Sequence, residues 1–221
     1  MSKIKAFIFD FDGTIVDSEK FHFNSLNEVL KKFNVQYDYD FYLKTLAGIP
    51  NAQSSKMIIE YSNLSISIDK FAQMRKEVAT HRLKNEDIIF MPYAIEMLDF
   101  LHAKEYPIAL VTGSPRILVD YIFSKTNLSK YFKTTITCSD VKESKPHPES
   151  YDLCVNTLGF KKNEYLVFED TQNGIKSAKA AGLTTFAIQH YEAVHPKLKI
   201  ADKIFKDFSE VQNYVVDKKL I

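Results

Sequence analysis

The stretch Phe7–Thr14 reads Phe-Ile-Phe-Asp-Phe-Asp-Gly-Thr and decides how the rest of the chain is interpreted. The apolar run 6–9 in front of the acids is rich in β-favouring residues and predicts a strand buried on both faces. Asp10 and Asp12 follow it directly. Two carboxylates this close repel each other, so they indicate a cation or hydrogen bonds that compensate. An ordinary polar turn would look similar, but the carboxyl end of a buried strand favours a ligand site.

The composition limits the class of protein. The chain has 221 residues, 45% of them hydrophobic, which is enough for one domain or a core with an insert. Its net charge of +1 gives no sign of a nucleic-acid partner. Cys138 and Cys154 form no Cys-x-x-Cys pair, and no apolar run has membrane-spanning length. We therefore expect a cytoplasmic monomer with no membrane partner.

The order of predicted elements indicates the fold. Helical spacing dominates after the first strand and predicts helices over 18–33, 41–46, 52–61 and 68–83. Strands and helices then alternate, with strands expected at 108–111, 134–137, 165–168, 184–188 and 201–205 and helices at 93–104, 117–126, 149–158 and 172–181. We expect an α/β, Rossmann-like three-layer sandwich with a parallel sheet, formed by 1–16 and 88–221. A helical domain, 17–87, is inserted into it.

Groups suited to phosphate chemistry follow several of these strands. They are Thr112, Gly113 and Ser114 after the second strand, Lys145 in a loop, and Glu169 and Asp170 after the fourth strand. Clustered acids make a hard-oxygen site suited to Mg²⁺. Thr112 and the N–H groups beside it, where a helix is expected to begin, indicate an anion cradle, and Lys145 can neutralise phosphate. Each feature alone has an ordinary structural explanation, but their joint occurrence indicates one site.

These motifs resemble those of the haloacid dehalogenase-like phosphohydrolases. The matching stretches are 10–14 (Asp-Phe-Asp-Gly-Thr), 111–114 (Val-Thr-Gly-Ser), 144–148 (Ser-Lys-Pro-His-Pro) and 168–174 (Phe-Glu-Asp-Thr-Gln-Asn-Gly). They occur in the family's order and spacing, and the resemblance covers essentially the whole chain. It is nearest to the β-phosphoglucomutase-like subgroup, and the helical insert resembles the family's helical cap.

The resemblance implies a Mg²⁺-dependent phosphatase that works through an aspartyl-phosphate. Asp10 would attack phosphorus, and Asp12 would protonate the leaving oxygen and then deprotonate water. The metal-binding set it implies is Asp10, Asp170 and the Asp12 backbone, with Glu169 assisting. The residues it implies for holding the phosphoryl oxygens are Thr112, Gly113 and Lys145, with Ser114 beside them.

The substrate is expected to be a small phosphorylated metabolite, and several residues are candidates for selecting it. These are His22, Asn51 and Arg116, with Arg75, Lys76, His81 and Arg82 as further cations, and each also fits an ordinary structural role. A β-phosphoglucomutase-type mutase is the first alternative, but the family's mutases place an arginine in the cap loop. Here that loop, 46–52, contains no cation. A non-catalytic regulatory protein on this fold is the second alternative. A degraded member of the family should have lost an essential carboxylate or Lys145, and none of these is missing here.

Overall fold

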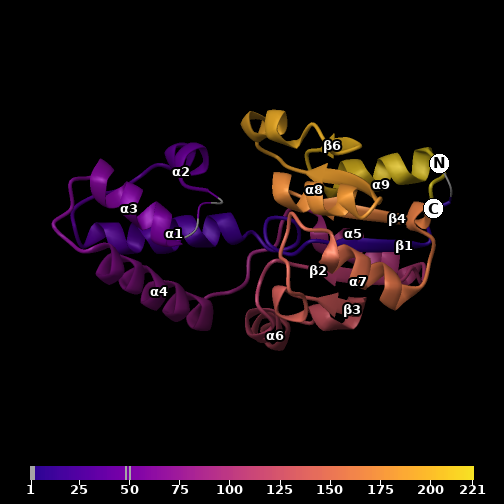
Figure 1. Ribbon diagram of the computed structural model, residues 1–221, viewed down its shortest axis with the longest axis horizontal. Coiled ribbons are helices and arrows are strands. Elements are labelled where there is room, and N and C mark those ends of the chain that lie inside the picture. The colour runs from indigo at the N-terminus through magenta and orange to yellow at the C-terminus, as the bar shows by residue number, and fades with distance from the viewer. Residues whose placement is uncertain (1–2, 48, 50) are drawn as a thin grey trace. The chain divides into compact units, whose positions relative to one another are not determined.

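The computed structural model describes residues 3–47, 49 and 51–221 (Figure 1). The chain divides into two compact units, Met1–Asp17 with Phe90–Ile221, and Ser18–Ile89. We call the first the α/β unit and the second the helical unit, and each is described by itself. Among the described residues no helix is both long and apolar enough to cross a membrane.

The α/β unit is built on a parallel sheet. Its strands are β1 (Ala6–Phe9), β2 (Ile108–Val111), β3 (Phe132–Ile136), β4 (Tyr165–Glu169), β5 (Thr184–Ile188) and β6 (Lys203–Phe205). Their order across the sheet is β3-β2-β1-β4-β5-β6. In the register, Ile8 of β1 aligns with Ala109 on one side and Val167 on the other. The strand order therefore reverses between β1 and β4, which is where sheets of this kind bind ligands.

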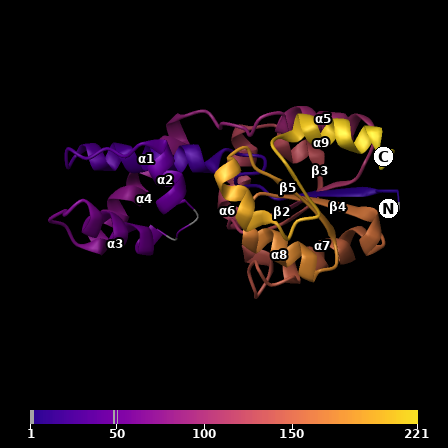
Figure 2. The same cartoon turned by 90° about the horizontal axis from the view of Figure 1, so that it is seen from above.

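Helices cover both faces of this sheet. They are α5 (Ala94–Ala103), α6 (Arg116–Lys125), α7 (Glu149–Leu158), α8 (Gln172–Ala180) and α9 (Phe208–Asp217), with short 3₁₀ turns η1 (Leu128–Tyr131), η2 (Cys138–Asp140), η3 (Lys162–Glu164) and η4 (Glu192–Leu198). Figure 2 shows α5 and α9 on one face and α7 and α8 on the other. This arrangement confirms the predicted Rossmann-like three-layer sandwich with a parallel sheet.

Alternate side chains of β1 pack into different layers, as a pleated strand requires. Ile8 belongs to a buried cluster with Cys154 of α7. Phe9 lies on the other side, with its ring centroid 5.5 Å from that of Phe208 in α9. Both faces of β1 are therefore buried, and each large apolar side chain removed from water contributes about 1.5–3 kcal/mol. This burial fixes the strand whose end carries Asp10.

The main differences from the predicted elements lie at the sheet edges and the C-terminal end, while β4 and several helix ends differ from the prediction by one or two residues. The strand expected at 134–137 is β3, which begins at Phe132, and the one expected at 201–205 is β6, which begins at Lys203. Helix α9 was not predicted. Its start is marked by Asp207, whose side chain accepts hydrogen bonds from the N–H groups of Ser209 and Glu210. Phe208, Val211 and Val215 then recur at helical spacing, so the signal was present in the sequence.

The helical unit contains α1 (Ser18–Lys31), α2 (Tyr39–Thr45), α3 (Asn51–Tyr61) and α4 (Ile68–Asn85). Its buried core includes Leu30 of α1, Ile58 of α3 and Phe71 of α4. The sequence predicted all four helices, because each has apolar residues at helical spacing. Asp38 and Ser67 cap α2 and α4 by accepting hydrogen bonds from backbone N–H groups.

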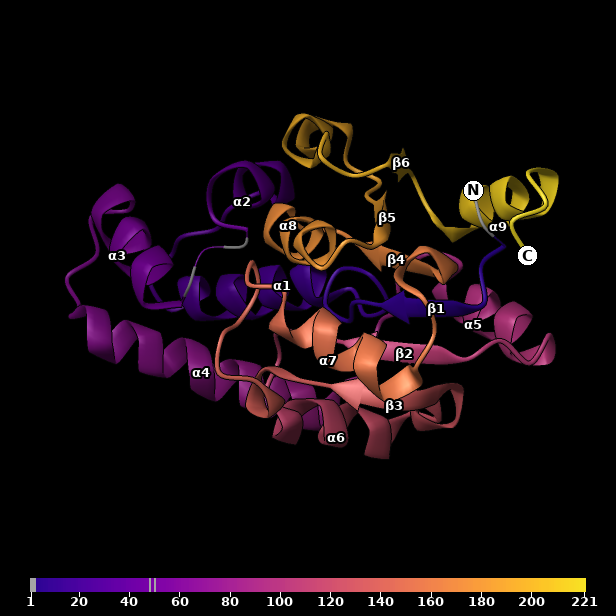
Figure 3. The same cartoon turned by 45° about the vertical axis from the view of Figure 1, so that its right-hand side comes forward.

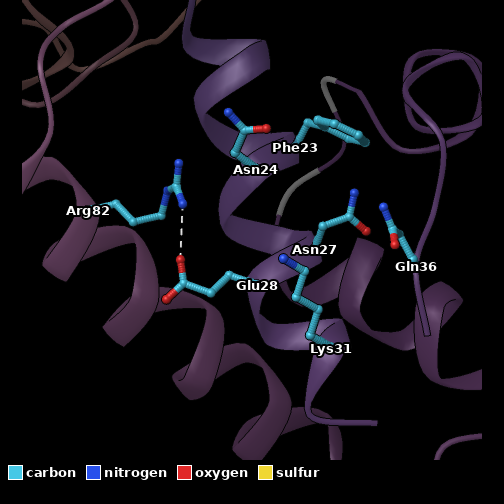
Figure 4. A pocket seen from close by; sticks show the side chains of 7 residues that line it. All are labelled: Phe23, Asn24, Asn27, Glu28, Lys31, Gln36 and Arg82. Carbon is cyan, nitrogen blue, oxygen red and sulfur yellow. Dashed lines mark hydrogen bonds and ion pairs between the residues drawn. The ribbon is translucent and has the colours of Figure 1, made fainter. Parts of the chain in front are cut away.

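A polar pocket of about 250 Å³ lies on the helical unit (Figure 4). It is lined by Phe23, Asn24, Asn27, Glu28, Lys31, Gln36 and Arg82. The Arg82 guanidinium is paired with Glu28 at 3.0 Å and with Glu86 at 2.7 Å. The Asn27 amide is paired with both backbone groups of Tyr37. The hydrogen-bonding groups of Arg82 and Asn27 thus serve mainly to tie α1 to α4 and to the loop before α2.

Candidate active site

The central strands bring the predicted site residues to one edge of the sheet. Because β1, β2 and β4 are adjacent and parallel, their carboxyl ends lie at the same edge (Figure 3). Asp10 follows β1, Thr112 follows β2, and Glu169 ends β4 with Asp170 after it. The Asp10 N–H donates to the carbonyl of Phe168 at 2.9 Å, so the sheet pairing continues up to the acid itself.

Lys145 links three of these strand ends from its loop. Its Nζ atom donates to Asp10 Oδ1 and Glu169 Oε1, both at 2.7 Å, and to the Val111 carbonyl at 2.8 Å. All three ammonium protons therefore have acceptors. Burial alone would lower the pKa of Lys145, but the attraction of Asp10 and Glu169 outweighs it and raises the pKa. The side chain is only 10% exposed and remains an ammonium ion at neutral pH.

The Asp10 carboxyl is in an unfavourable place for a negative charge. Burial is the largest influence on it and raises its pKa. The Lys145 ammonium opposes the rise, but the nearby carboxylates of Glu169 and Asp12 add to it, and the net pKa is raised. More positive charge at this position would favour the ionised form of Asp10.

The acidic cluster fits a divalent cation. Asp10, Glu169 and Asp170 each offer a carboxylate oxygen, and these atoms lie within 4.8 Å of one another. The ammonium of Lys145 balances one of the three charges, which leaves a formal excess of two when all are ionised. That excess equals the charge of one Mg²⁺ ion, and carboxylate oxygens are the ligands this ion prefers.

Glu169 is more firmly held than the sequence indicated. Its Oε1 accepts a hydrogen bond from the Tyr151 hydroxyl at 2.7 Å, besides that from Lys145. Its Oε2 accepts weaker bonds from the N–H groups of Asp170 and Thr171, at 3.2 and 3.4 Å. Tyr151 was missed because a buried aromatic on α7 looks, in the sequence, like any other core residue. With these contacts Glu169 anchors the Lys145 ammonium at the end of β4.

Gly13 allows the loop after β1 to pass close to Asp170. Its φ of +79° lies in the left-handed region that favours glycine. A Cβ atom at this position would collide with the Asp170 carboxylate. In the Asp-x-Asp-Gly sequence, Asp10 and Asp12 are therefore followed by glycine, the only residue type that fits beside the Asp170 carboxylate.

Asp12 is fixed by hydroxyl groups that follow β2. Its Oδ2 accepts a hydrogen bond from Ser114 Oγ at 2.6 Å and a longer one from Thr112 Oγ1 at 3.4 Å. The Ser114 N–H, expected as part of an anion cradle, donates instead to Thr112 Oγ1 at 2.9 Å. The helix also begins later than that cradle requires, at Arg116. The N–H of Gly113 has no hydrogen bond to the described residues and stays the better anion donor.

The candidates for substrate selection have local partners. Arg116 is paired with Asp140 at 2.6 Å and donates to the Thr135 carbonyl at 2.7 Å, which ties it to the segment around β3. In the helical unit His22 is exposed, with its ring beside that of Phe21.

The side chain of Asn51 accepts a hydrogen bond from the Ser55 hydroxyl and donates to the Ala72 carbonyl, all within the helical unit. Of the predicted cap loop 46–52, Gly48 and Pro50 lie outside the described residues.

Comparison with known proteins agrees with this geometry. A family model described as haloacid dehalogenase-like hydrolase matches residues 7–188. A fructose-1-phosphate phosphatase of Escherichia coli K12 is 30% identical over 80% of this chain and 92% of its own length. A phosphorylated carbohydrates phosphatase of Thermotoga maritima is 28% identical over 81% of this chain and 82% of its own length.

The fold has a counterpart among solved structures. A HAD family hydrolase from Deinococcus radiodurans R1, with bound phosphate and sodium, has a TM-score of 0.87 and is 20% identical. The structural match covers 100% of this chain and 99% of the Deinococcus chain. The family match spans most of the sequence and includes Asp10, Lys145 and Asp170. The chain therefore belongs to the haloacid dehalogenase-like hydrolases.

Proposed function

We propose that the protein is a Mg²⁺-dependent phosphatase that hydrolyses a small phosphorylated metabolite, such as a sugar phosphate, through an aspartyl-phosphate on Asp10. The observation that supports this best is the ammonium of Lys145 against Asp10 Oδ1, with a second acid, Asp12, two residues away. A carboxylate nucleophile beside a cation and a separate proton carrier is the minimum that such a reaction needs.

The reaction has two steps. In the first, an oxygen of Asp10 forms a bond to phosphorus, and the bond from phosphorus to the leaving oxygen breaks. The leaving oxygen keeps the electron pair and takes a proton from Asp12. In the second, a water oxygen attacks phosphorus while Asp12 accepts a proton from that water. The bond between phosphorus and Asp10 then breaks, and both carboxyl groups return to their first state.

Positive charge and hydrogen-bond donors would hold the transferring phosphoryl group. Thr112, Lys145 and the N–H of Gly113 are the groups proposed for its oxygens. Asp10, Asp170 and the Asp12 backbone carbonyl, with Glu169 assisting, would hold Mg²⁺. When bound, the ion would supply charge that offsets the repulsion between the Asp10 carboxylate and phosphate.

The named relatives support a phosphatase and a carbohydrate-like substrate. One is named for fructose 1-phosphate and another for phosphorylated carbohydrates, and we carry that class over to this chain. We further propose that residues 17–87 act as the substrate-selecting cap and that 1–16 with 88–221 form the catalytic domain. The mutase alternative is weakened by the cap loop 46–52, which contains no cation. The cytoplasmic location and the monomeric state stay predictions.

Phosphate release from a panel of sugar phosphates and p-nitrophenyl phosphate, with and without Mg²⁺, tests the proposal. We expect Mg²⁺-dependent turnover by the wild type and its loss, by at least about a thousandfold, in Asp10→Asn. The matched control is Asp120→Asn, on the exposed side of α6, which should keep wild-type activity. A folded Asp10→Asn variant that keeps more than a few per cent of the activity would rule out the aspartyl-phosphate, and an inactive wild type would favour the regulatory alternative.

A further inference from the structure

The two oxygens of Asp12 have different surroundings. Oδ2 accepts hydrogen bonds from Ser114 Oγ at 2.6 Å and from Thr112 Oγ1 at 3.4 Å. No hydrogen bond reaches Oδ1 from any residue that the structure describes. The bond from Ser114 has the short length typical of a hydroxyl that donates to a carboxylate. One oxygen of Asp12 is thus held and the other is available.

The position of the Ser114 hydroxyl is set by its backbone. The Ser114 N–H donates to Thr112 Oγ1 at 2.9 Å, and its carbonyl accepts from the Cys138 N–H at 3.3 Å. Two residues further on, the Arg116 N–H donates to Ser139 Oγ at 3.1 Å. Thr112 thus holds the N–H of Ser114, and the segment after β3 holds its carbonyl and Arg116. With the backbone fixed in this way, one side-chain torsion decides whether the hydroxyl reaches Asp12.

We propose that Ser114 is a positioning residue that holds Asp12 by Oδ2 and thereby makes Oδ1 the atom that gives and takes the proton. The inference rests on the proposed function and adds to it a residue that acts through Asp12. In the first step Oδ1 gives its proton to the leaving oxygen as the bond from that oxygen to phosphorus breaks and Asp10 bonds to phosphorus. In the second step Oδ1 takes a proton from the attacking water.

This role predicts a particular dependence on the leaving group. A leaving group that is stable as an anion departs without help from an acid, whereas an alcohol must be protonated as it leaves. p-Nitrophenyl phosphate and benzyl phosphate form a suitable pair, since they are similar in size and differ strongly in leaving-group ability. The ratio kcat/KM is the right measure, because it reports the steps up to phosphoryl transfer and does not depend on the later hydrolysis of the aspartyl-phosphate.

The experiment measures kcat/KM for both substrates with the full chain and saturating Mg²⁺. We expect Ser114→Ala to lower the value for benzyl phosphate at least about tenfold more than the value for p-nitrophenyl phosphate. Ser114→Cys, which keeps the size and loses the strong donor, should show the same pattern. Ser114→Thr, which keeps the hydroxyl, should restore the wild-type ratio of the two substrates. If Ser114→Ala does not fold, Ser114→Cys carries the same test.

Ser139→Ala is the matched control, because it loosens the same loop without touching Asp12. Any loss it causes should be equal for the two substrates. Equal losses in the Ser114→Ala and Ser114→Cys variants, or no loss, would overturn the positioning role while leaving the phosphatase proposal intact. A wild type that hydrolyses neither substrate with Mg²⁺ would contradict the proposed function and, with it, the positioning role of Ser114.

Discussion

The Glu169 carboxylate occupies the space in which a side chain at Gly174 would lie. A Cβ atom built at position 174 collides with the carboxylate carbon and both oxygens of Glu169. Gly174 lies in the first turn of α8, where its N–H donates to Thr171 Oγ1. The glycine therefore lets Glu169 lie close to the helix, and from there Glu169 reaches Lys145.

Gly174→Ala tests this packing. In an ordinary helix the change stabilises by about 0.5–1 kcal/mol. Here the new methyl group must displace Glu169, which leaves the buried Lys145 ammonium with one acceptor fewer. We expect a net loss of about 1–3 kcal/mol in the free energy of unfolding, measured in urea, together with reduced phosphatase activity.

Gly113→Ala is the control for stability, since nothing lies within 4 Å of the position of its Cβ. It should unfold at nearly the wild-type urea concentration. An increase in stability in Gly174→Ala, as for an unhindered helix position, would contradict the close packing of Gly174 against Glu169.

Removal of one carboxylate should weaken Mg²⁺ binding and also relieve repulsion. Asp170→Asn removes one of the three clustered acids. We expect the half-saturating Mg²⁺ concentration to rise at least about tenfold. Without Mg²⁺ the variant should be more stable than the wild type, because fewer like charges are held together.

The stability measurement needs no substrate. A ligand present at a hundred times its Kd stabilises the folded state by about 2.7 kcal/mol, so Mg²⁺ should raise the Tm of the wild type far more than that of Asp170→Asn. The exposed Asp120→Asn serves again as a control. The same Mg²⁺-induced shift in all three proteins would mean that Asp170 is not a ligand.

Asp140 should make stability depend on pH in the acid range. Burial alone would raise its pKa, but hydrogen bonds from Thr137 and Arg116 outweigh this and lower it. A lowered folded-state pKa gives stability that is fully present above the unfolded value of about 4 and is lost as pH falls through the folded value. We expect Asp140→Asn to cost about 1 kcal/mol at pH 7, because the carboxylate is a third exposed and partly screened.

The check is urea unfolding of wild type and Asp140→Asn between pH 7 and pH 2.5. The difference between them should shrink as the pH falls below about 4. A difference that stays constant over this range would show that the charge on Asp140 contributes nothing and that only its shape matters.

Three inner strands could be predicted to the residue and β4 to within one residue, whereas the edge strands could not. Strands β1, β2 and β5 have the predicted bounds because they are continuous apolar runs that end at polar residues. Strand β3, at the edge, is only partly buried, and its Lys133 is exposed. An edge strand needs no unbroken apolar run, so its start at Phe132 has no clear mark in the sequence.

The gathering of the acids could also be predicted, whereas their hydrogen bonds could not. Parallel strands place Asp10, Thr112 and Asp170 at one edge of the sheet, independently of the conformation of the loops. Which hydroxyl reaches Asp12 depends on the path of the loop after β2. That path is set by contacts such as Cys138 N–H to the Ser114 carbonyl, which join segments far apart in the sequence.

The products formed from β-glucose 1-phosphate would distinguish a phosphatase from a mutase. A mutase must hold a bisphosphorylated intermediate by its distal phosphate, which calls for a cation, and the cap loop 46–52 contains none. Elsewhere in the helical unit, Arg82 is neutralised by Glu28 and Glu86. We therefore expect that β-glucose 1-phosphate, if accepted, yields glucose and phosphate. Incubation with Mg²⁺ and a trace of the 1,6-bisphosphate, followed by ³¹P NMR, measures the products.

Accumulation of glucose 6-phosphate faster than phosphate would overturn the phosphatase proposal, and Arg75, Lys76 or Arg82 would then be expected to replace the missing arginine. Arg75 donates to the hydroxyls of Ser54 and Ser55, at 2.8 and 3.1 Å, and has no carboxylate partner among the described residues. Burial lowers its pKa, as expected for a guanidinium without a counter-ion. Arg75→Met should then abolish glucose 6-phosphate formation but spare phosphate release, whereas Arg82→Met should leave the ratio of the two products unchanged.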